Sequence, residues 1–188
     1  MTTISNAIIK DHRELEEYYN EVVNNPNDQD HQQRYGNQFV WELARHAVAE
    51  ELVVYPAMEK YLGSKGKEMT DHDREEHHKV KEMLQIFQGL SSSDSNYTPK
   101  LQEIWKSLKV HIKEEEERDL PAIEDALKTS KGESESMANS FERTKAFVPT
   151  RSHPMAGEHP PFETAMALLT APIDYVADVF RKFPRENL

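Results

Sequence analysis

The sequence contains no cysteine, and this absence excludes several kinds of site. Without thiols the chain can form no disulfide bond, no thiolate zinc site and no iron–sulfur cluster. A transition-metal site in this chain would have to use imidazole nitrogen and oxygen ligands. The absence of cysteine also fits a reducing compartment.

Long apolar runs and an excess of basic residues are also missing. The first 20 residues are polar from the start, and no stretch approaches the ~20 apolar residues that a transmembrane helix needs. We therefore expect a cytoplasmic protein that binds no membrane. Only 23 Lys and Arg stand against 34 Asp and Glu, so the formal net charge is −11. An acidic surface repels the phosphate backbone, so nucleic acid is not an expected partner.

Helical periodicity is plentiful. Apolar residues recur at helical spacing in four long segments, which cover about residues 5–23, 30–62, 70–87 and 98–127. Gly63 suits the end of the second segment, and Thr70 is placed to cap the third. Pro56 and Pro121 should kink or interrupt their helices. Short connections between four such segments predict an all-α fold, an up-down-up-down four-helix bundle.

The remaining third of the chain differs in character. We predict a bundle domain over residues 1–128 and a C-terminal extension over residues 129–188. Residues 131–136 read as a linker, and residues 162–183 read as two helical pieces broken near Pro172. Val176, Val179 and Phe180 form an apolar stripe, which predicts an additional C-terminal helix that packs on the bundle.

An internal repeat with an offset of 65 residues runs through the predicted bundle. It matches His46-Ala-Val-Ala-Glu50-Glu51 to His111-Ile-Lys-Glu-Glu115-Glu116, Tyr55-Pro56-Ala57 to Leu120-Pro121-Ala122, and Asp11-His12 to Glu76-His77. The first helical hairpin therefore resembles the second. Such a duplication predicts a bundle with a pseudo-two-fold axis.

The spacing within the repeat predicts a metal site. Residues four apart share one face of a helix, so each His-x-x-x-Glu pair can point into one site. The predicted ligands are four imidazoles and two carboxylates: His12, His46, Glu50, His77, His111 and Glu115. The simplest arrangement assigns two histidines to each of two metal ions, His12 with His46 and His77 with His111, bridged by both glutamates. Such ligands suit iron, manganese or zinc.

At these residues the chain resembles the hemerythrin-like, or HHE cation-binding, family. The resemblance covers about residues 4–128, and the tail resembles the extension of fungal members. It implies two iron ions joined by an oxo or hydroxo bridge. Oxygen-carrying hemerythrins have a further histidine one turn from the third-helix ligand, but Asp73 and Lys81 occupy those positions here. This departure argues against oxygen transport and leaves a metal position open, for which Glu16 is a candidate seventh ligand.

Two main functions follow. The first is a non-heme di-iron protein that binds oxygen, nitric oxide or iron for sensing, storage or stress protection. The second is a di-iron oxidase or oxygenase acting on a small molecule. A ferritin-like oxidase uses Glu-x-x-His, which neither motif fits, and a metal-free interaction bundle is the remaining alternative. We expect a monomer or a weak homodimer.

The other five histidines lie outside the repeat. We expect solvated loop positions for His31 and His159 and a helix start for His72. His78 should point away from the site, because neighbours on a helix diverge by about 100°. His153 could reach the site if the tail folds across the end of the bundle.

Overall fold

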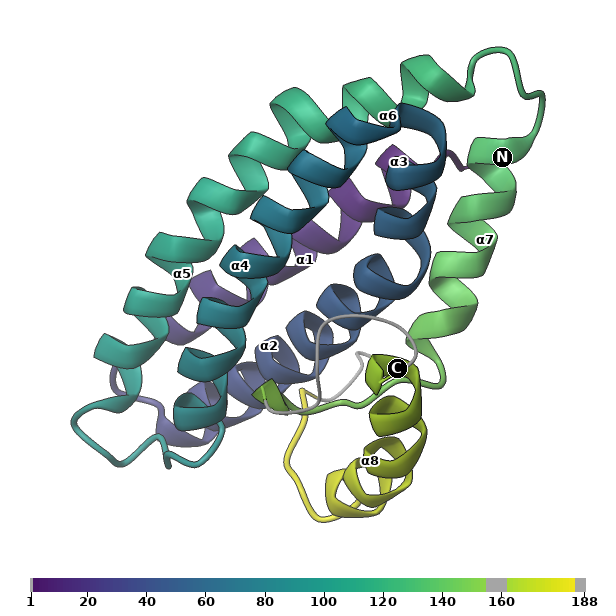
Figure 1. The fold of residues 1–188 in the computed structure, drawn as a ribbon. Helices are drawn as coiled ribbons and strands as arrows, with labels where there is room; N and C mark the ends of the chain where they lie inside the picture. The colour runs from purple at the N-terminus through teal and green to yellow at the C-terminus, as the bar shows by residue number, and fades with distance from the viewer. Residues whose placement is uncertain (1, 155–161, 185–188) are drawn as a thin grey trace.

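The chain is all-helical in a computed structural model that describes residues 2–154 and 162–184, and these residues include no strand (Figure 1). The bundle consists of four long helical segments. They are α1 (Ile4–Asn24); α2 (Gln29–Ala49) continued by the π-helix η1 (Glu50–Val54) and α3 (Tyr55–Leu62); α4 (Ser64–Phe87); and α5 (Tyr97–Glu114) continued by the π-helix η2 (Glu115–Asp119) and α6 (Leu120–Leu127). The predicted all-α bundle is confirmed.

Side-chain caps start the first two segments, each within one residue of the predicted start. The Thr3 hydroxyl accepts from the backbone N–H of Asn6, and the Asp28 carboxylate accepts from that of His31. The third segment starts earlier than predicted, directly after Gly63, whose φ of 62° ends α3. Thr70 is therefore no cap. It is buried inside α4, and its hydroxyl donates to Glu59 and to a backbone carbonyl.

Near each of the two repeated prolines the α-helix is interrupted, as expected, and the interruption is a short π-helix. Pro56 and Pro121 are each the second residue after a π-helix, η1 and η2 respectively. In both places the backbone N–H of the residue before the proline donates a hydrogen bond to the carbonyl five residues earlier. Tyr55 donates to Glu50, and Leu120 donates to Glu115. The widened turn accommodates a residue that lacks an N–H. Each π-helix begins at a predicted metal ligand, so the repeat encodes a local backbone feature as well as side chains.

Two apolar clusters fill the bundle, one on each side of a polar layer. One contains Leu15, Phe39, Leu84 and Leu101, and the other contains Ile8 with residues of α3, α6 and α7. Because Ile8 and Leu15 flank His12 on α1, the histidine lies between the two clusters. The polar layer is thus enclosed by packed hydrophobic side chains at both ends.

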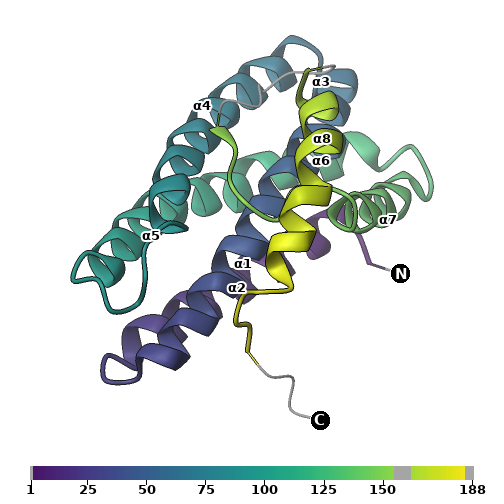
Figure 2. The ribbon, with the colours of Figure 1, turned by 90° about the horizontal axis from the view of Figure 1, so that it is seen from below.

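The C-terminal extension contributes two helices, and the first was not predicted. The segment read as a linker enters α7 (Glu133–Lys145), which packs on α1, α2 and η1 through Met137, Ala138 and Phe141. Figures 1 and 2 place α8 (Phe162–Asp178) outside the bundle, beside α2. It runs unbroken through Pro172, contrary to the expected two pieces.

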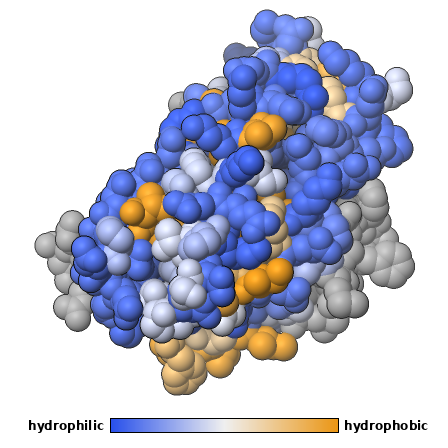
Figure 3. Space-filling model, turned by 90° about the vertical axis from the view of Figure 1, so that its left-hand side faces the viewer, coloured by the Kyte–Doolittle hydropathy of each residue, from blue (hydrophilic) through white to orange (hydrophobic). Residues whose placement is uncertain are grey.

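The predicted contact face of α8 was wrong. Val176, Val179 and Phe180 are 64%, 78% and 85% exposed. The helix instead turns Ala171 and Asp174 inward, where Asp174 accepts from the Arg151 backbone N–H. The face shown in Figure 3 is largely hydrophilic, with hydrophobic residues in several small patches and along its lower edge. No described helix has the length and apolar character needed to cross a membrane. The domain boundary near residue 128 stays a prediction.

Candidate metal centre

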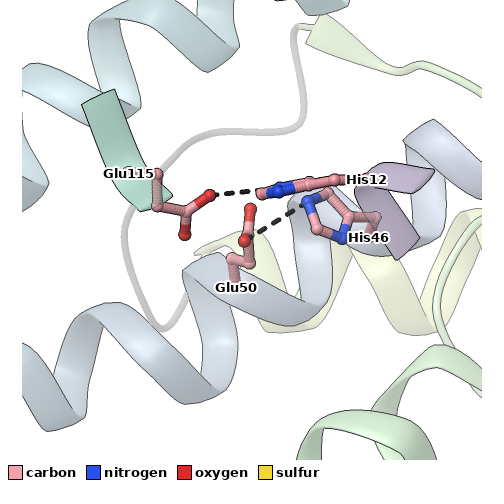
Figure 4. A group of neighbouring side chains, drawn as sticks. All are labelled: His12, His46, Glu50 and Glu115. Atoms are coloured by element: carbon pink, nitrogen blue, oxygen red, sulfur yellow. Dashed lines mark ion pairs between the residues drawn. The ribbon is translucent and has the colours of Figure 1, made fainter. Parts of the chain in front are cut away.

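The structure brings all six predicted ligand residues together in the polar layer. His12 comes from α1, His46 from α2, His77 from α4 and His111 from α5. Glu50 and Glu115 are the first residues of the two π-helices. All six are 0–4% exposed. Figure 4 shows Glu50 and Glu115 pointing toward one another, with His12 and His46 beside them.

The carboxylates lie between histidines of different pairs. Glu50 directs Oε1 to Nε2 of His46 at 3.3 Å and Oε2 to Nε2 of His77 at 3.4 Å. Oε2 of Glu115 lies 3.2 Å from Nε2 of His12 and 3.9 Å from Nε2 of His111. Two groups of side chains have ligand atoms close enough to share an ion: His12, His46, Glu50 and Glu115, and Glu50, His77 and His111. The two histidine pairs are those that the repeat predicts, but only Glu50 belongs to both groups, so bridging by Glu115 stays a prediction.

The spacing of the nitrogen atoms fits a metal ion. Nε2 of His77 and Nε2 of His111 are 3.1 Å apart. Two ligand atoms, each ~2.1 Å from an ion and at right angles, are separated by about 3 Å. The nitrogen pair therefore has the separation of two neighbouring ligands of one ion.

Four polar atoms at the centre have no hydrogen-bond partner in the described part of the chain. They are Nε2 of His12, both carboxylate oxygens of Glu50 and Oε2 of Glu115. Burial and the neighbouring Glu115 carboxylate raise the pKa of Glu50 well above its usual range. Buried polar atoms without partners are costly, and all of these face one another. Cations placed among them would satisfy these atoms, so the residues present fit a pair of metal ions.

A second set of carboxylates orients the four imidazoles. Each Nδ1 lies at hydrogen-bond distance from one carboxylate: 2.8 Å from Glu116 for His12, 3.2 Å from Asp11 for His46, 3.0 Å from Glu51 for His77 and 2.9 Å from Glu76 for His111. A carboxylate at Nδ1 favours the proton there and directs the Nε2 lone pair toward the centre. These four partners also obey the 65-residue offset, because Asp11 matches Glu76 and Glu51 matches Glu116.

Basic groups stand behind these carboxylates. Arg13 donates to Glu116 at 2.6 Å, and Lys81 lies 2.5 Å and 2.6 Å from the two oxygens of Glu51. Lys145, the last residue of α7, donates to both oxygens of Asp11 at 2.6 Å and 2.7 Å. Burial opposes ionisation of Asp11, but His46 and Lys145 together lower its pKa to about 2. The C-terminal extension thus reaches the group that orients His46.

Sequence reasoning identified the six central residues but missed most of their partners. The repeat already contained the four outer carboxylates, which appear in it beside the ligands. Nothing in the local sequence pointed to Lys145, since its role depends on how α7 packs across α1 and α2. The contact between Lys145 and Asp11 joins residues that are 134 positions apart in the sequence.

The remaining histidines lie away from the central group. The side chain of His78 is 42% exposed and pairs with Glu82 at 3.5 Å. His31 lies in α2, not in a loop, and pairs with Glu21 at 2.8 Å. His72 lies well inside α4, where it contacts Glu114. His153 binds Asp174 of α8 at 2.9 Å and does not reach the centre.

Two further expectations concern Glu16 and His159. Glu16 lines a surface pocket with Trp105 and Lys109 and is absent from the described groups that could hold a metal. His159 lies outside the described residues.

Comparison with known proteins identifies the class to which this fold and centre belong. The family model of the hemerythrin HHE cation-binding domain matches residues 3–123. The chain belongs to this family. Its buried clusters of histidine and glutamate occupy the matched region.

The chain is also similar in sequence to two individual proteins. It is 55% identical over 184 residues to a hemerythrin-like protein of Schizosaccharomyces pombe, covering 98% of this chain and 89% of that protein. It is 26% identical over 148 residues to a protein of Nostoc named DNA nickase, covering 79% of this chain and 40% of that protein. No solved structure matches the chain significantly.

Proposed function

We propose that the chain is a non-heme di-iron protein that binds a small diatomic ligand, oxygen or nitric oxide, or handles iron itself. One ion would be held by His12 and His46 and the other by His77 and His111, with Glu50 and Glu115 bridging them. The observation that carries the proposal is the set of buried atoms at the centre that lack a hydrogen-bond partner among the described residues, enclosed by four oriented imidazoles. Iron in such a centre would supply reversible electron exchange and an open coordination position.

The residues of the chain set the conditions for this chemistry. The outer carboxylates hold the imidazoles with Nε2 facing inward, and they raise the basicity of the ligands. The apolar clusters on both sides exclude bulk water from the centre. The ligand residues are 0–4% exposed, which favours a diatomic molecule over a bulky organic substrate. This depth of burial ranks the oxidase or oxygenase alternative second.

The cellular role and the location of the protein belong to the same proposal. Sensing, storage and protection against stress all need a centre that binds such a ligand, and we place the protein in the cytoplasm. A net charge of −11 disfavours the phosphate backbone as a partner, so the proposal does not include action on DNA.

The test is metal analysis of the purified chain, followed by absorption spectra of the iron-loaded protein with and without oxygen and nitric oxide. The proposal expects two iron ions per chain and a spectrum that changes reversibly with the diatomic ligand. Steady consumption of oxygen with an added organic compound would instead support the oxidase. A chain that retains no metal after loading would overturn both.

A further inference from the structure

The four carboxylates that orient the imidazoles differ in the cations behind them. Three of them contact the side chain of an arginine or a lysine: Glu116, Glu51 and Asp11. Glu76, the fourth, has no lysine or arginine within ion-pair distance in the described part of the chain. The basic groups that it faces are the imidazoles of His111, at 2.9 Å, and of His72, at 3.7 Å.

The 65-residue repeat shows which group occupies the equivalent place in the first hairpin. Glu76 matches Asp11, and Asp11 accepts hydrogen bonds from the buried ammonium of Lys145 at the end of α7. Asp11 therefore has an imidazole on one side and a cation on the other. Glu76 has the imidazole of His111 on one side, and a cation on its other side would complete the same arrangement.

Side chains with ligand atoms lie on the second hairpin at the positions that α7 covers on the first. His72 on α4 and Glu114 on α5 match Ala7 and Ala49, which are buried in the apolar cluster that includes α7. In the second hairpin this face is at the surface, because the side chains of His72 and Glu114 are 47% and 39% exposed. The same helix positions thus carry alanine beneath α7 and metal-ligand side chains where solvent reaches them.

The side chains of His72, Glu76 and Glu114 converge on one imidazole nitrogen. Nε2 of His72 lies 3.3 Å from Oε2 of Glu114 and 3.7 Å from Oε1 of Glu76. Both distances exceed the ~2.7–2.9 Å of a charge-assisted hydrogen bond. Two ligand atoms that are each ~2.1 Å from a tetrahedrally coordinated ion lie about 3.4 Å apart. The three residues therefore have the spacing of ligands around one ion, and their ligand atoms all lie within 4.8 Å of one another.

Arg118 is the other cation on this face, and it is engaged elsewhere. Its guanidinium donates to the carboxylate of Asp119 at 2.8 Å and 3.1 Å. It stays 3.7 Å from Glu114 and forms no ion pair with Glu76 among the described residues. Arg118 therefore does not supply the cation that Lys145 supplies on the other side.

We propose that His72, Glu76 and Glu114 hold a divalent transition-metal ion at the surface of the bundle, outside the central pair. One imidazole and two carboxylates suit zinc, ferrous iron or manganese, with water completing the coordination shell. The ion would stand behind Glu76 as Lys145 stands behind Asp11. It would bind more weakly than the central ions, because its three ligand side chains are partly exposed. The inference goes beyond the proposed function, since none of the three residues is a central ligand.

The test uses zinc as the probe and the iron-loaded full-length chain, freed of loose metal on a desalting column. Calorimetric titration with zinc chloride at a fixed neutral pH counts the additional sites and gives their dissociation constants. The variants are His72→Ala and Glu114→Gln, which change exposed side chains. His78→Ala is the matched control, because His78 faces Glu82 in the same i,i+4 arrangement on α4 and its side chain is 42% exposed. Thermal melts report folding.

The inference expects the wild-type chain to bind one zinc ion beyond its iron. Loss of an outer group around a metal costs about 10- to 100-fold in affinity, and loss of a direct ligand should cost at least as much. His72→Ala and Glu114→Gln should therefore weaken zinc binding by at least about 10-fold, while His78→Ala should bind as wild type does. A zinc-soaked crystal should show an anomalous peak at the zinc edge between the three side chains.

Three results would overturn the inference. They are a wild-type chain that takes up no zinc beyond the centre, a His72→Ala chain with the affinity of wild type, and equal losses in His72→Ala and His78→Ala. The comparison does not depend on iron in the centre. A chain that retains no iron would overturn the proposed function, whereas the difference of one zinc ion between wild type and His72→Ala would still decide the surface site.

Discussion

Replacing Lys145 by methionine removes the ammonium group that the C-terminal extension buries beside the metal centre. Lys145 and Asp11 have side chains 6% and 0% exposed, and they lie 2.6 Å apart. Methionine keeps most of the aliphatic stem, so the change acts mainly on the charge. Asp11 would remain buried with only His46 as a polar partner, whereas Glu42 would keep its contact with Arg45 at 2.5 Å.

Breaking one partner of a buried ion pair costs about 3–5 kcal/mol. This is a large part of the ~5–15 kcal/mol by which a domain is typically stable. The two groups are charged at neutral pH. Despite burial, His46 and Lys145 lower the pKa of Asp11 to about 2, and despite burial, Glu42 and Asp11 raise the pKa of Lys145 above its usual value. A lowered carboxyl pKa stabilises the fold above the unfolded value of about 4, and this contribution is lost as the pH falls toward 2.

The assay is denaturant unfolding of the metal-free full-length chain at neutral pH, where bound metal cannot mask the loss. Lys128→Met is the control, since the pair Lys128–Asp125 has side chains 73% and 74% exposed and should change stability by less than about 1 kcal/mol. Iron titration of both variants follows, and Lys145→Met should weaken the His12–His46 ion. Equal stability losses in the two variants, or unchanged iron affinity in Lys145→Met, would refute the link between α7 and His46.

Three further outcomes follow from the geometry. Glu50→Ala and Glu115→Ala should each reduce bound metal to one ion or none, because each carboxylate faces both histidine pairs; metal analysis that finds two ions in both variants would exclude bridging. His77→Ala should lose metal while His78→Ala keeps both ions, since His77 is buried and the side chain of His78 is 42% exposed; equal losses would show that the register is wrong. Burial opposes protonation of His12, but Glu115 and Glu116 raise its pKa to about 9. A metal ion must therefore displace a proton from His12, and chelator competition should show metal affinity rising as the pH approaches 9. A metal affinity that is flat or falls with pH would contradict this.

The bundle could be predicted from the sequence because its signals are local and periodic. Helical periodicity gave the four segments to within a few residues at most ends, and Gly63 marked a true helix end. The start of α4 was missed because Thr70 has the chemistry of a cap, yet packing places it inside the helix. The prolines were expected to kink or interrupt their helices, and a π-turn interrupts the α-helix just before each one.

The extension was harder to predict, because its contacts are tertiary. A polar stretch after Gly132 reads as a linker, but α7 covers the bundle with a few apolar residues. The apolar stripe of α8 suggested the buried face, yet the helix packs through Ala171 and Asp174. Periodicity shows that a helix has an apolar side, but it does not show that another element covers that side.

The six central residues could be predicted because duplication set them in one register. The outer carboxylates were present in the same repeat, but only the structure shows that they contact Nδ1 of each histidine. Asp73 was noted as a departure from a histidine pattern. Its burial, and the lack of a hydrogen-bond partner for its oxygens among the described residues, emerge from the fold alone.

The central claim, that these six residues hold two metal ions, is tested most directly by anomalous diffraction from crystals of the iron-loaded full-length chain. The account predicts two peaks at the iron absorption edge, about 3.5–4 Å apart, one beside His12 and His46 and the other beside His77 and His111. Glu50 and Glu115 should lie between the peaks. A single peak, or peaks only at the exposed group of His72, Glu76 and Glu114, would contradict it.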